Sequence, residues 1–122
     1  MKRIIITDDE IMNLRMTEFI LKKAGYETVK TASGIECLNA VRERKPDLIL
    51  LDLLMPEMNG FEVIERLREM DEGRDIPVIL LTAAEDKESL DKAHEIGVFA
   101  CVGKPFKQEE LLGTIQPVKG QL

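Results

Sequence analysis

Blocks of aliphatic residues alternate with amphipathic stretches along the chain. Five blocks, most of them nearly unbroken by polar residues, are typical of strands that a parallel sheet buries on both faces. They span residues 2–7, 27–31, 47–52, 77–82 and 98–102. Only the second block is markedly polar, with Glu27, Lys30 and Thr31 around Val29, which favours a place at the edge of the sheet.

Between the blocks, apolar residues recur at the three- to four-residue spacing of helices. We expect five core-facing stripes: Met12, Met16, Phe19 and Ile20; Ile35, Leu38 and Val41; Phe61, Ile64 and Leu67; Leu90, Ala93 and Gly97; and Leu111, Leu112 and Ile115. Gly25 and Gly97 are typical of helix ends. Pro117 is expected to close a short fifth helix that Gly113 interrupts.

Strands that each precede a helix predict a parallel sheet with right-handed crossovers and helices on both faces. The fold class is therefore α/β, a doubly wound five-stranded parallel sheet. The polar second strand fits an edge and the apolar third strand fits the centre, which favours strand order 2-1-3-4-5. In this topology the order reverses between strands 1 and 3, and ligands bind at the carboxyl ends of the strands there.

Length and composition restrict the chain to one domain. Its 122 residues, 44% hydrophobic and 33% charged, can bury a core of their own, which excludes a two-domain enzyme and intrinsic disorder. We expect a single domain over residues 1–122, in which residues 117–122 form a tail or the start of a linker.

Charge and apolar run lengths exclude several kinds of partner. With 17 Lys and Arg against 23 Asp and Glu, the net charge of −6 disfavours nucleic acid and anionic membranes. The apolar runs are too short to cross a membrane and no leader opens the sequence, so we expect a cytoplasmic protein. Two cysteines and one histidine, His94, exclude disulfide scaffolds and Cys/His zinc sites.

Polar residues end four of the five predicted strands. Asp8 and Asp9 follow the first, Asp52 ends the third, Thr82 ends the fourth and Lys104 follows the fifth. Carboxylates about 4 Å apart repel by roughly 4 kcal/mol at an effective dielectric near 20, so three of them need a cation besides one lysine. An all-oxygen site suits Mg²⁺, which commonly joins carboxylates to phosphate oxygens. The pattern predicts metal-assisted phosphate chemistry.

Each of these residues also has a purely structural interpretation. Asp8 or Asp9 can cap the following helix, Asp52 can belong to a turn, and Thr82 is a good strand former. Lys104 can be a solvated lysine. Their joint placement at one end of four strands argues for a site. His94 is expected to be solvated, and Met55 and Met58 to fill gaps beneath the loop after Asp52.

Four motifs together resemble the receiver domain of two-component response regulators. They are Asp8-Asp9-Glu10, the run from Leu51 to Gly60 around Asp52, Leu81-Thr82-Ala83, and Gly103-Lys104-Pro105-Phe106. The resemblance implies that Asp52 is the phosphoacceptor and that Asp8, Asp9, Asp52 and the Leu54 backbone carbonyl bind Mg²⁺ or Mn²⁺. It also implies that Thr82 and the Ala83 N–H hydrogen-bond the phosphoryl group, that Lys104 pairs with it, and that the peptide before Pro105 is commonly cis.

The resemblance implies a signalling domain rather than an enzyme. Its phosphoryl group would come from a phosphohistidine of a histidine kinase or a histidine phosphotransfer protein. A downstream protein target would read the surface of the fourth helix, fifth strand and fifth helix. Receivers usually place Tyr or Phe where Cys101 stands, so the usual readout is in doubt, and we expect Cys101 to be a small core residue. The resemblance also implies that the residues two beyond Asp52 and Thr82 tune hydrolysis of the phosphoryl group, so apolar Leu54 and Ala84 at these positions predict a long-lived one.

Three other functions compete with this one. A pseudo-receiver would bind partners without phosphorylation, although the polar set is intact. A small Mg²⁺-dependent phosphatase typically has a second Asp two positions after its nucleophile, where this chain has Leu54. A flavodoxin-like FMN binder would need a Ser/Thr-rich phosphate loop where Asp8 and Asp9 stand.

Overall fold

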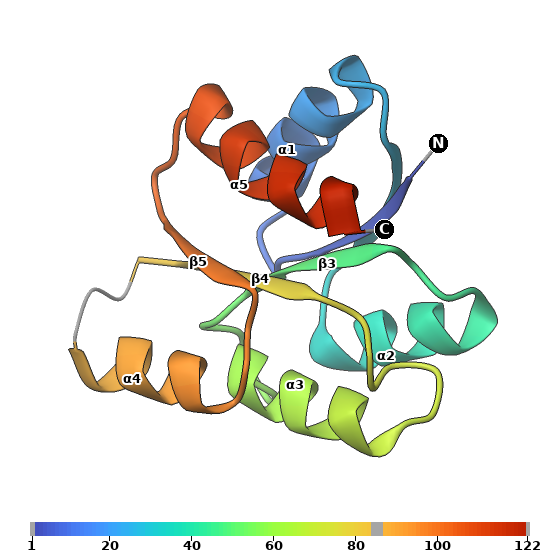
Figure 1. Cartoon of the computed structure of the whole chain (residues 1–122), viewed down its shortest axis with the longest axis vertical. Coiled ribbons are helices and arrows are strands. Elements are labelled where there is room, and N and C mark those ends of the chain that lie inside the picture. The colour runs from blue at the N-terminus through green and yellow to red at the C-terminus, as the bar shows by residue number, and fades with distance from the viewer. Residues whose placement is uncertain (1, 84–86, 122) are drawn as a thin grey trace.

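Strands and helices alternate along the chain in the computed structural model, which describes residues 2–83 and 87–121 (Figure 1). Side chains are described through residue 118. The elements are β1 (Arg3–Thr7), α1 (Ile11–Lys23), β2 (Glu27–Thr31), α2 (Gly34–Glu43), β3 (Leu48–Asp52), α3 (Gly60–Glu69), β4 (Val78–Thr82), α4 (Lys87–Glu95), β5 (Ala100–Gly103) and α5 (Gln108–Gln121).

The strands form one parallel sheet in the order β2-β1-β3-β4-β5, which confirms the predicted fold class and strand order. Every residue of β3 and β4 is buried, as expected for aliphatic strands inside a sheet covered on both faces. The polar strand β2 lies at one edge. There Thr31 is the only fully buried residue of the strand.

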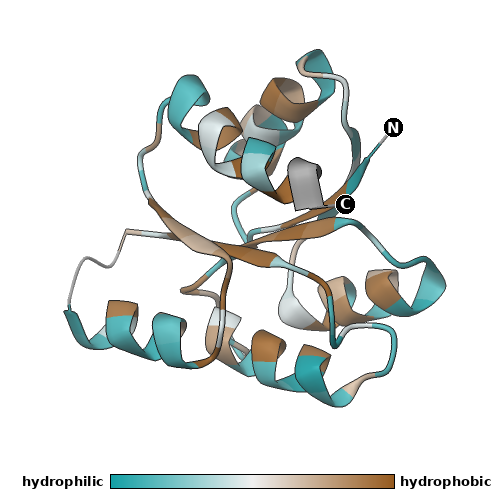
Figure 2. Ribbon diagram, viewed as in Figure 1, coloured by the Kyte–Doolittle hydropathy of each residue, from teal (hydrophilic) through white to brown (hydrophobic). Residues whose placement is uncertain are grey.

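Helices cover both faces of the sheet, with α1 and α5 on one face and α2, α3 and α4 on the other (Figure 1). Successive strand residues point to opposite faces, so each strand supplies two cores. Ile5 and Leu80 belong to the core beneath α2 and α3, whereas Ile6 and Leu81 belong to the core beneath α1 and α5. Figure 2 shows largely hydrophobic strands between helices in which hydrophilic and hydrophobic residues alternate.

A capping box and a close backbone contact set the start of α3. The Asn59 side chain accepts a hydrogen bond from the Glu62 N–H, and the Glu62 carboxylate accepts one from the Asn59 N–H. A Cβ on Gly60 would lie only 3.0 Å from both the Asp52 carbonyl oxygen and the Leu53 Cα. The absence of a side chain at Gly60 therefore lets α3 begin directly against the end of β3.

The prediction of the core-facing stripe of α1 is confirmed for Ile20 and wrong for its other three residues. Met12, Met16 and Phe19 are 73%, 49% and 65% exposed. The buried residues of α1 are instead Leu14, Thr17, Ile20 and Leu21. Apolar residues lie on nearly all sides of this helix, so spacing could not select the face that packs on the sheet. Ile35 and Leu90, which other predicted stripes included, are also exposed.

The fifth helix does not end at Pro117. Helix α5 continues through Pro117 to Gln121, so residues 117–121 are helical. An internal proline costs a helix about 3 kcal/mol. Leu111, Ile115 and Val118 are almost completely buried along one side of α5. Their burial against the sheet outweighs the local cost of Pro117.

Candidate acidic metal and phosphoacceptor site

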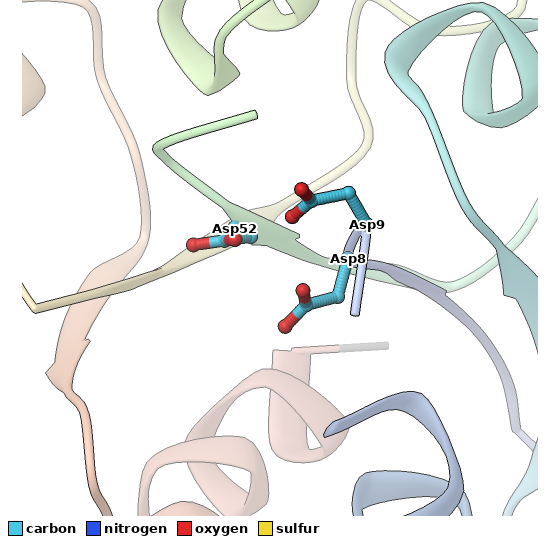
Figure 3. A group of neighbouring side chains, drawn as sticks. All are labelled: Asp8, Asp9 and Asp52. Carbon is cyan, nitrogen blue, oxygen red and sulfur yellow. The ribbon is translucent and has the colours of Figure 1, made fainter. Parts of the chain in front are cut away.

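Three carboxylates meet at the carboxyl edge of the sheet, on the two sides of the point where the strand order reverses. Asp8 and Asp9 follow β1, and Asp52 is the last residue of β3, the strand paired with β1. Each offers a carboxylate oxygen within 4.8 Å of the others. Figure 3 shows the three carboxyl groups directed to the same side of this edge. Asp8 and Asp52 are buried and Asp9 is exposed, so the cluster is open on one side.

Lys104 supplies the positive charge of the cluster. It directly follows β5, the edge strand at the opposite end of the strand order from β2. Its Nζ lies 2.7 Å from Asp8 Oδ2 and 3.3 Å from Asp52 Oδ1. The Lys104 backbone N–H donates to the Thr82 carbonyl, and the Lys104–Pro105 peptide is cis, as the resemblance implied. Asp8 also accepts the backbone N–H of Glu10. One ammonium thus contacts two carboxylates while Asp9 remains open to solvent.

Burial shapes the titration of the site. It raises the pKa of Asp52 from 3.8 to about 6, with the Lys104 ammonium opposing this effect and the charges of Asp8 and Asp9 adding to it. Burial alone would lower the pKa of Lys104, but its hydrogen bond to Asp8 and the charge of Asp52 outweigh that effect, so this pKa is raised. At neutral pH Lys104 is therefore an ammonium, and Asp52 is ionised at an electrostatic cost.

The other expected site residues lie on the same edge. Asp52 pairs with Leu81, so Thr82 lies one residue further along the neighbouring strand, where it is buried. Ala83 follows it and is exposed. Leu54 lies in the loop after β3 and is 64% exposed. Ala84 lies outside the described residues.

A cavity of about 280 Å³ lies beside the carboxylates, and sequence analysis did not anticipate it. Its lining residues are Asp8, Asn13, Met16, Thr17, Ala83, Lys104, Pro105 and Phe106. Met16 connects it to the exposed apolar stripe of α1, which we define as Met12, Met16 and Phe19. One feature of the sequence indicated this exposed stripe: helix α1 has more apolar positions than one buried face requires.

Cys101 does not occupy the place expected for it. Its side chain is exposed on β5, which lies at the edge of the sheet, so the prediction of a small core residue is wrong. The next residue, Val102, points to the core instead. Met55 and Met58 do pack in the core beneath the loop after β3, and His94 is exposed, as predicted.

The donor set fits a hard divalent cation. Three carboxylates offer only oxygen ligands, they lie close enough to share one ion, and the site has an open side for water or phosphate. Thiolate and imidazole ligands, which softer metals prefer, do not take part in this cluster. A Mg²⁺ or Mn²⁺ ion is therefore the kind of ion that Asp8, Asp9 and Asp52 suit.

Comparison with known proteins agrees with this geometry. The family model described as the response regulator receiver domain matches residues 4–116. The chain is a response regulator receiver domain. Receiver domains bind Mg²⁺ at an acidic cluster of this kind and belong to signalling proteins rather than to enzymes in the ordinary sense. Within the described residues, no helix has the length and apolar character to cross a bilayer.

Similar receivers occur both among characterised relatives and among solved structures. The polar-differentiation response regulator DivK of Brucella anthropi is 36% identical over 119 residues, which cover 98% of this chain and 97% of DivK. The chemotaxis protein CheY4 of Vibrio cholerae superposes with a TM-score of 0.92 at 32% identity, covering 97% of this chain and 98% of CheY4.

A second similar structure contains the ion that the acidic cluster suits. The receiver domain of a Pseudomonas aeruginosa sensor histidine kinase superposes with a TM-score of 0.89 at 28% identity, covering 98% of both chains. That structure holds a magnesium ion coordinated in its active-site cleft.

Proposed function

We propose that this receiver accepts a phosphoryl group on Asp52 from a phosphohistidine of a histidine kinase or histidine phosphotransfer protein. The observation that carries the proposal is the meeting of Asp52 with Asp8, Asp9 and Lys104 at the reversal point of the sheet. The test is metal-dependent labelling of Asp52 by a small phosphodonor. We further propose that the chain acts in the cytoplasm, where such donors present their phosphohistidines.

The transfer needs a nucleophile and charge compensation. A carboxylate oxygen of Asp52 attacks phosphorus, the P–N bond to the donor imidazole breaks, and the bond's electron pair stays on the imidazole nitrogen, which takes a proton from solvent. Lys104, the Thr82 hydroxyl and the Ala83 N–H would bind the phosphoryl oxygens. A divalent ion held by Asp8, Asp9, Asp52 and the Leu54 carbonyl would supply further positive charge.

Two alternatives account for the site less well. A pseudo-receiver that only binds partners has no use for a buried carboxylate whose pKa is raised to about 6. Selection for stability alone would replace it. A phosphatase with an aspartyl intermediate would place a second acid two residues after the nucleophile, where the exposed Leu54 side chain lies. Both observations favour a phosphoacceptor.

We propose that the phosphodonor docks over the α1 stripe and that output uses the surface of α4, β5 and α5. Soluble proteins seldom leave large side chains such as Met12 and Phe19 exposed together unless a partner covers them. The stripe lies next to the cavity beside Asp8 and Lys104, so a protein seated on it could present an imidazole to Asp52.

Replacing Met12 and Phe19 by Gln is expected to slow phosphotransfer from a protein donor by about tenfold or more, because docking loses apolar contact. Labelling by acetyl phosphate should stay unchanged, because a small donor does not use the stripe. Leu90→Gln, an exposed apolar residue of α4 on the other face of the sheet, is the matched control. Equal slowing with both donors would contradict docking over α1.

Leu54→Asn is expected to quicken loss of the phosphoryl group by several-fold to about tenfold, equivalent to about 1 kcal/mol of barrier. The exposed Leu54 side chain has no hydrogen-bonding group to orient an attacking water, whereas Asn does. Decay of phosphorylated protein in excess Mg²⁺ after donor removal measures the effect, and adding Ala84→Glu should increase it. Unchanged decay in both variants would show that water access at these positions does not limit the lifetime.

A further inference from the structure

Helix α4 is weakly attached to the rest of the domain. Ala93 is its only buried residue in the described structure, and Leu90 is 44% exposed. The remaining residues of α4 are mostly charged. Helix α4 lies next to α3 on the same face of the sheet (Figure 1). An element with so little buried apolar surface depends strongly on each contact that it does make.

One such contact joins α4 to the first turn of α3. The Lys92 ammonium lies 4.8 Å from the centre of the Phe61 ring, within the range of a cation–π interaction. The ring itself is buried: Phe61 is only 8% exposed and belongs to the core beneath α3. Lys92 and Ala93 belong to the same turn of α4. The cation–π contact and the buried Ala93 side chain therefore attach the same part of the helix to the domain.

The other end of this connection lies at Asp52. Phe61 directly follows Gly60, where a Cβ would lie only 3.0 Å from both the Asp52 carbonyl oxygen and the Leu53 Cα. The Gly60 N–H also donates a 2.8 Å hydrogen bond to the Leu53 carbonyl. A displacement of the backbone after Asp52 therefore moves the start of α3, and the Phe61 ring with it.

We propose that the Lys92–Phe61 contact holds α4 against α3. When phosphorylation of Asp52 moves the backbone that follows it, this contact loosens. The attraction between an ammonium and a ring face falls off beyond about 6 Å, so a shift of the ring relative to α4 weakens it. The phosphorylation half of this inference rests on the proposed function. The route is independent of position 101, where this receiver has an exposed cysteine instead of an aromatic ring.

The experiment compares amide hydrogen exchange in α4 among variants of the full chain. Lys92→Met keeps the aliphatic stem and removes the charge, and Phe61→Leu keeps the apolar burial and removes the ring. Each is expected to raise exchange in α4 by about two- to fivefold. The double variant should add little to either single change, because both remove the same contact. Lys92→Arg should retain most of the wild-type protection.

The matched control is Lys87→Met, which removes the same charge from the first turn of the same helix. If Lys87→Met and Lys92→Met raise exchange equally, or if neither does, the contact does not hold α4 and the proposal is overturned. This comparison uses unphosphorylated protein. It therefore decides the anchoring whether or not Asp52 accepts phosphate.

Beryllofluoride with Mg²⁺, a stable mimic of the phosphoryl group, tests the coupling. It is expected to raise α4 exchange in the wild-type protein and to raise it less in Lys92→Met, which has already lost the contact. An equal rise in both proteins would overturn the coupling. Failure of beryllofluoride to bind at Asp52 would instead contradict the proposed function, which separates the two conclusions.

Discussion

Acetyl phosphate with Mg²⁺ is expected to place one phosphoryl group on Asp52, and the Asp52→Asn variant is expected to accept none. Asp52 ends β3 inside the acidic cluster and, like Asp8, is buried and contacts Lys104, so its carboxylate can reach phosphorus beside a bound cation. A metal ion is worth several kcal/mol of charge stabilisation at a phosphoryl group. Chelation with EDTA should therefore slow labelling by about 100-fold or more.

Intact-protein mass spectrometry followed by peptide mapping measures the labelling and its position. Glu57→Gln is the matched control, because it removes an acid from the loop after β3 without touching the cluster. It should be labelled like the wild-type protein. Equal labelling of Asp52→Asn, or labelling that survives EDTA, would contradict the assignment of Asp52 as the phosphoacceptor.

Asp52→Asn is also expected to stabilise the metal-free protein at neutral pH. Burial and the charges of Asp8 and Asp9 raise the pKa of Asp52 to about 6, so the folded state ionises this group at a cost. A pKa displacement of this size corresponds to about 3 kcal/mol at most. Solvent at the open side of the cluster screens part of it, which leaves an expected gain of about 1 to 2 kcal/mol. Lys104 keeps its partner in the variant, since it also pairs with Asp8.

The raised pKa of Asp52 also determines how the contribution of this group to the stability of the protein changes with pH. Between pH 4 and pH 6 the folded wild-type protein binds more protons at Asp52 than the unfolded chain does, so this group's contribution to stability falls as pH rises. The advantage of Asp52→Asn should be small near pH 4 and largest above pH 6. Urea unfolding across this range measures it. A variant that is less stable than the wild type at pH 7 in EDTA would contradict the electrostatic cost.

Magnesium should reverse this order of stability. An ion that binds the folded wild-type cluster stabilises it by mass action, whereas the variant has lost one ligand. Adding Mg²⁺ should therefore raise the unfolding midpoint of the wild type more than that of Asp52→Asn. Equal shifts in the two proteins would indicate that the ion does not bind at Asp52.

Much of the fold was predictable because strand positions follow from local composition. The blocks that became β3 and β4 are so aliphatic that only a sheet covered on both faces can bury them, and the polar β2 could pair on one side only. Strand order then implied where Asp8 and Asp52 would meet. Both steps needed no knowledge of side-chain packing, which explains why they agree with the structure.

The errors concern positions where several arrangements satisfy the same pattern. Helix α1 has apolar residues on most sides, so the spacing of apolar residues does not specify its buried face. Leu14 and Leu21 are buried because that side of the helix packs on the sheet. Pro117 is locally unfavourable in a helix, yet burial of Val118 outweighs its cost. Cys101 looked like a core residue, but it pairs with the buried Leu80 from the edge strand β5, and there the helices on that face leave it exposed.

The sequence by itself determined which chemical groups end the strands, because the alternation of apolar blocks with Asp8, Asp52, Thr82 and Lys104 is a local property. Tertiary structure alone decided the distances between these groups and the shifts of the Asp52 and Lys104 pKa values. Lys104 reaches both carboxylates because β5 and β1 end at the same edge of the sheet, and burial at that edge displaces the pKa of Asp52. Contacts between residues far apart in the chain depend on how helices pack on the sheet, and no local pattern specifies that packing.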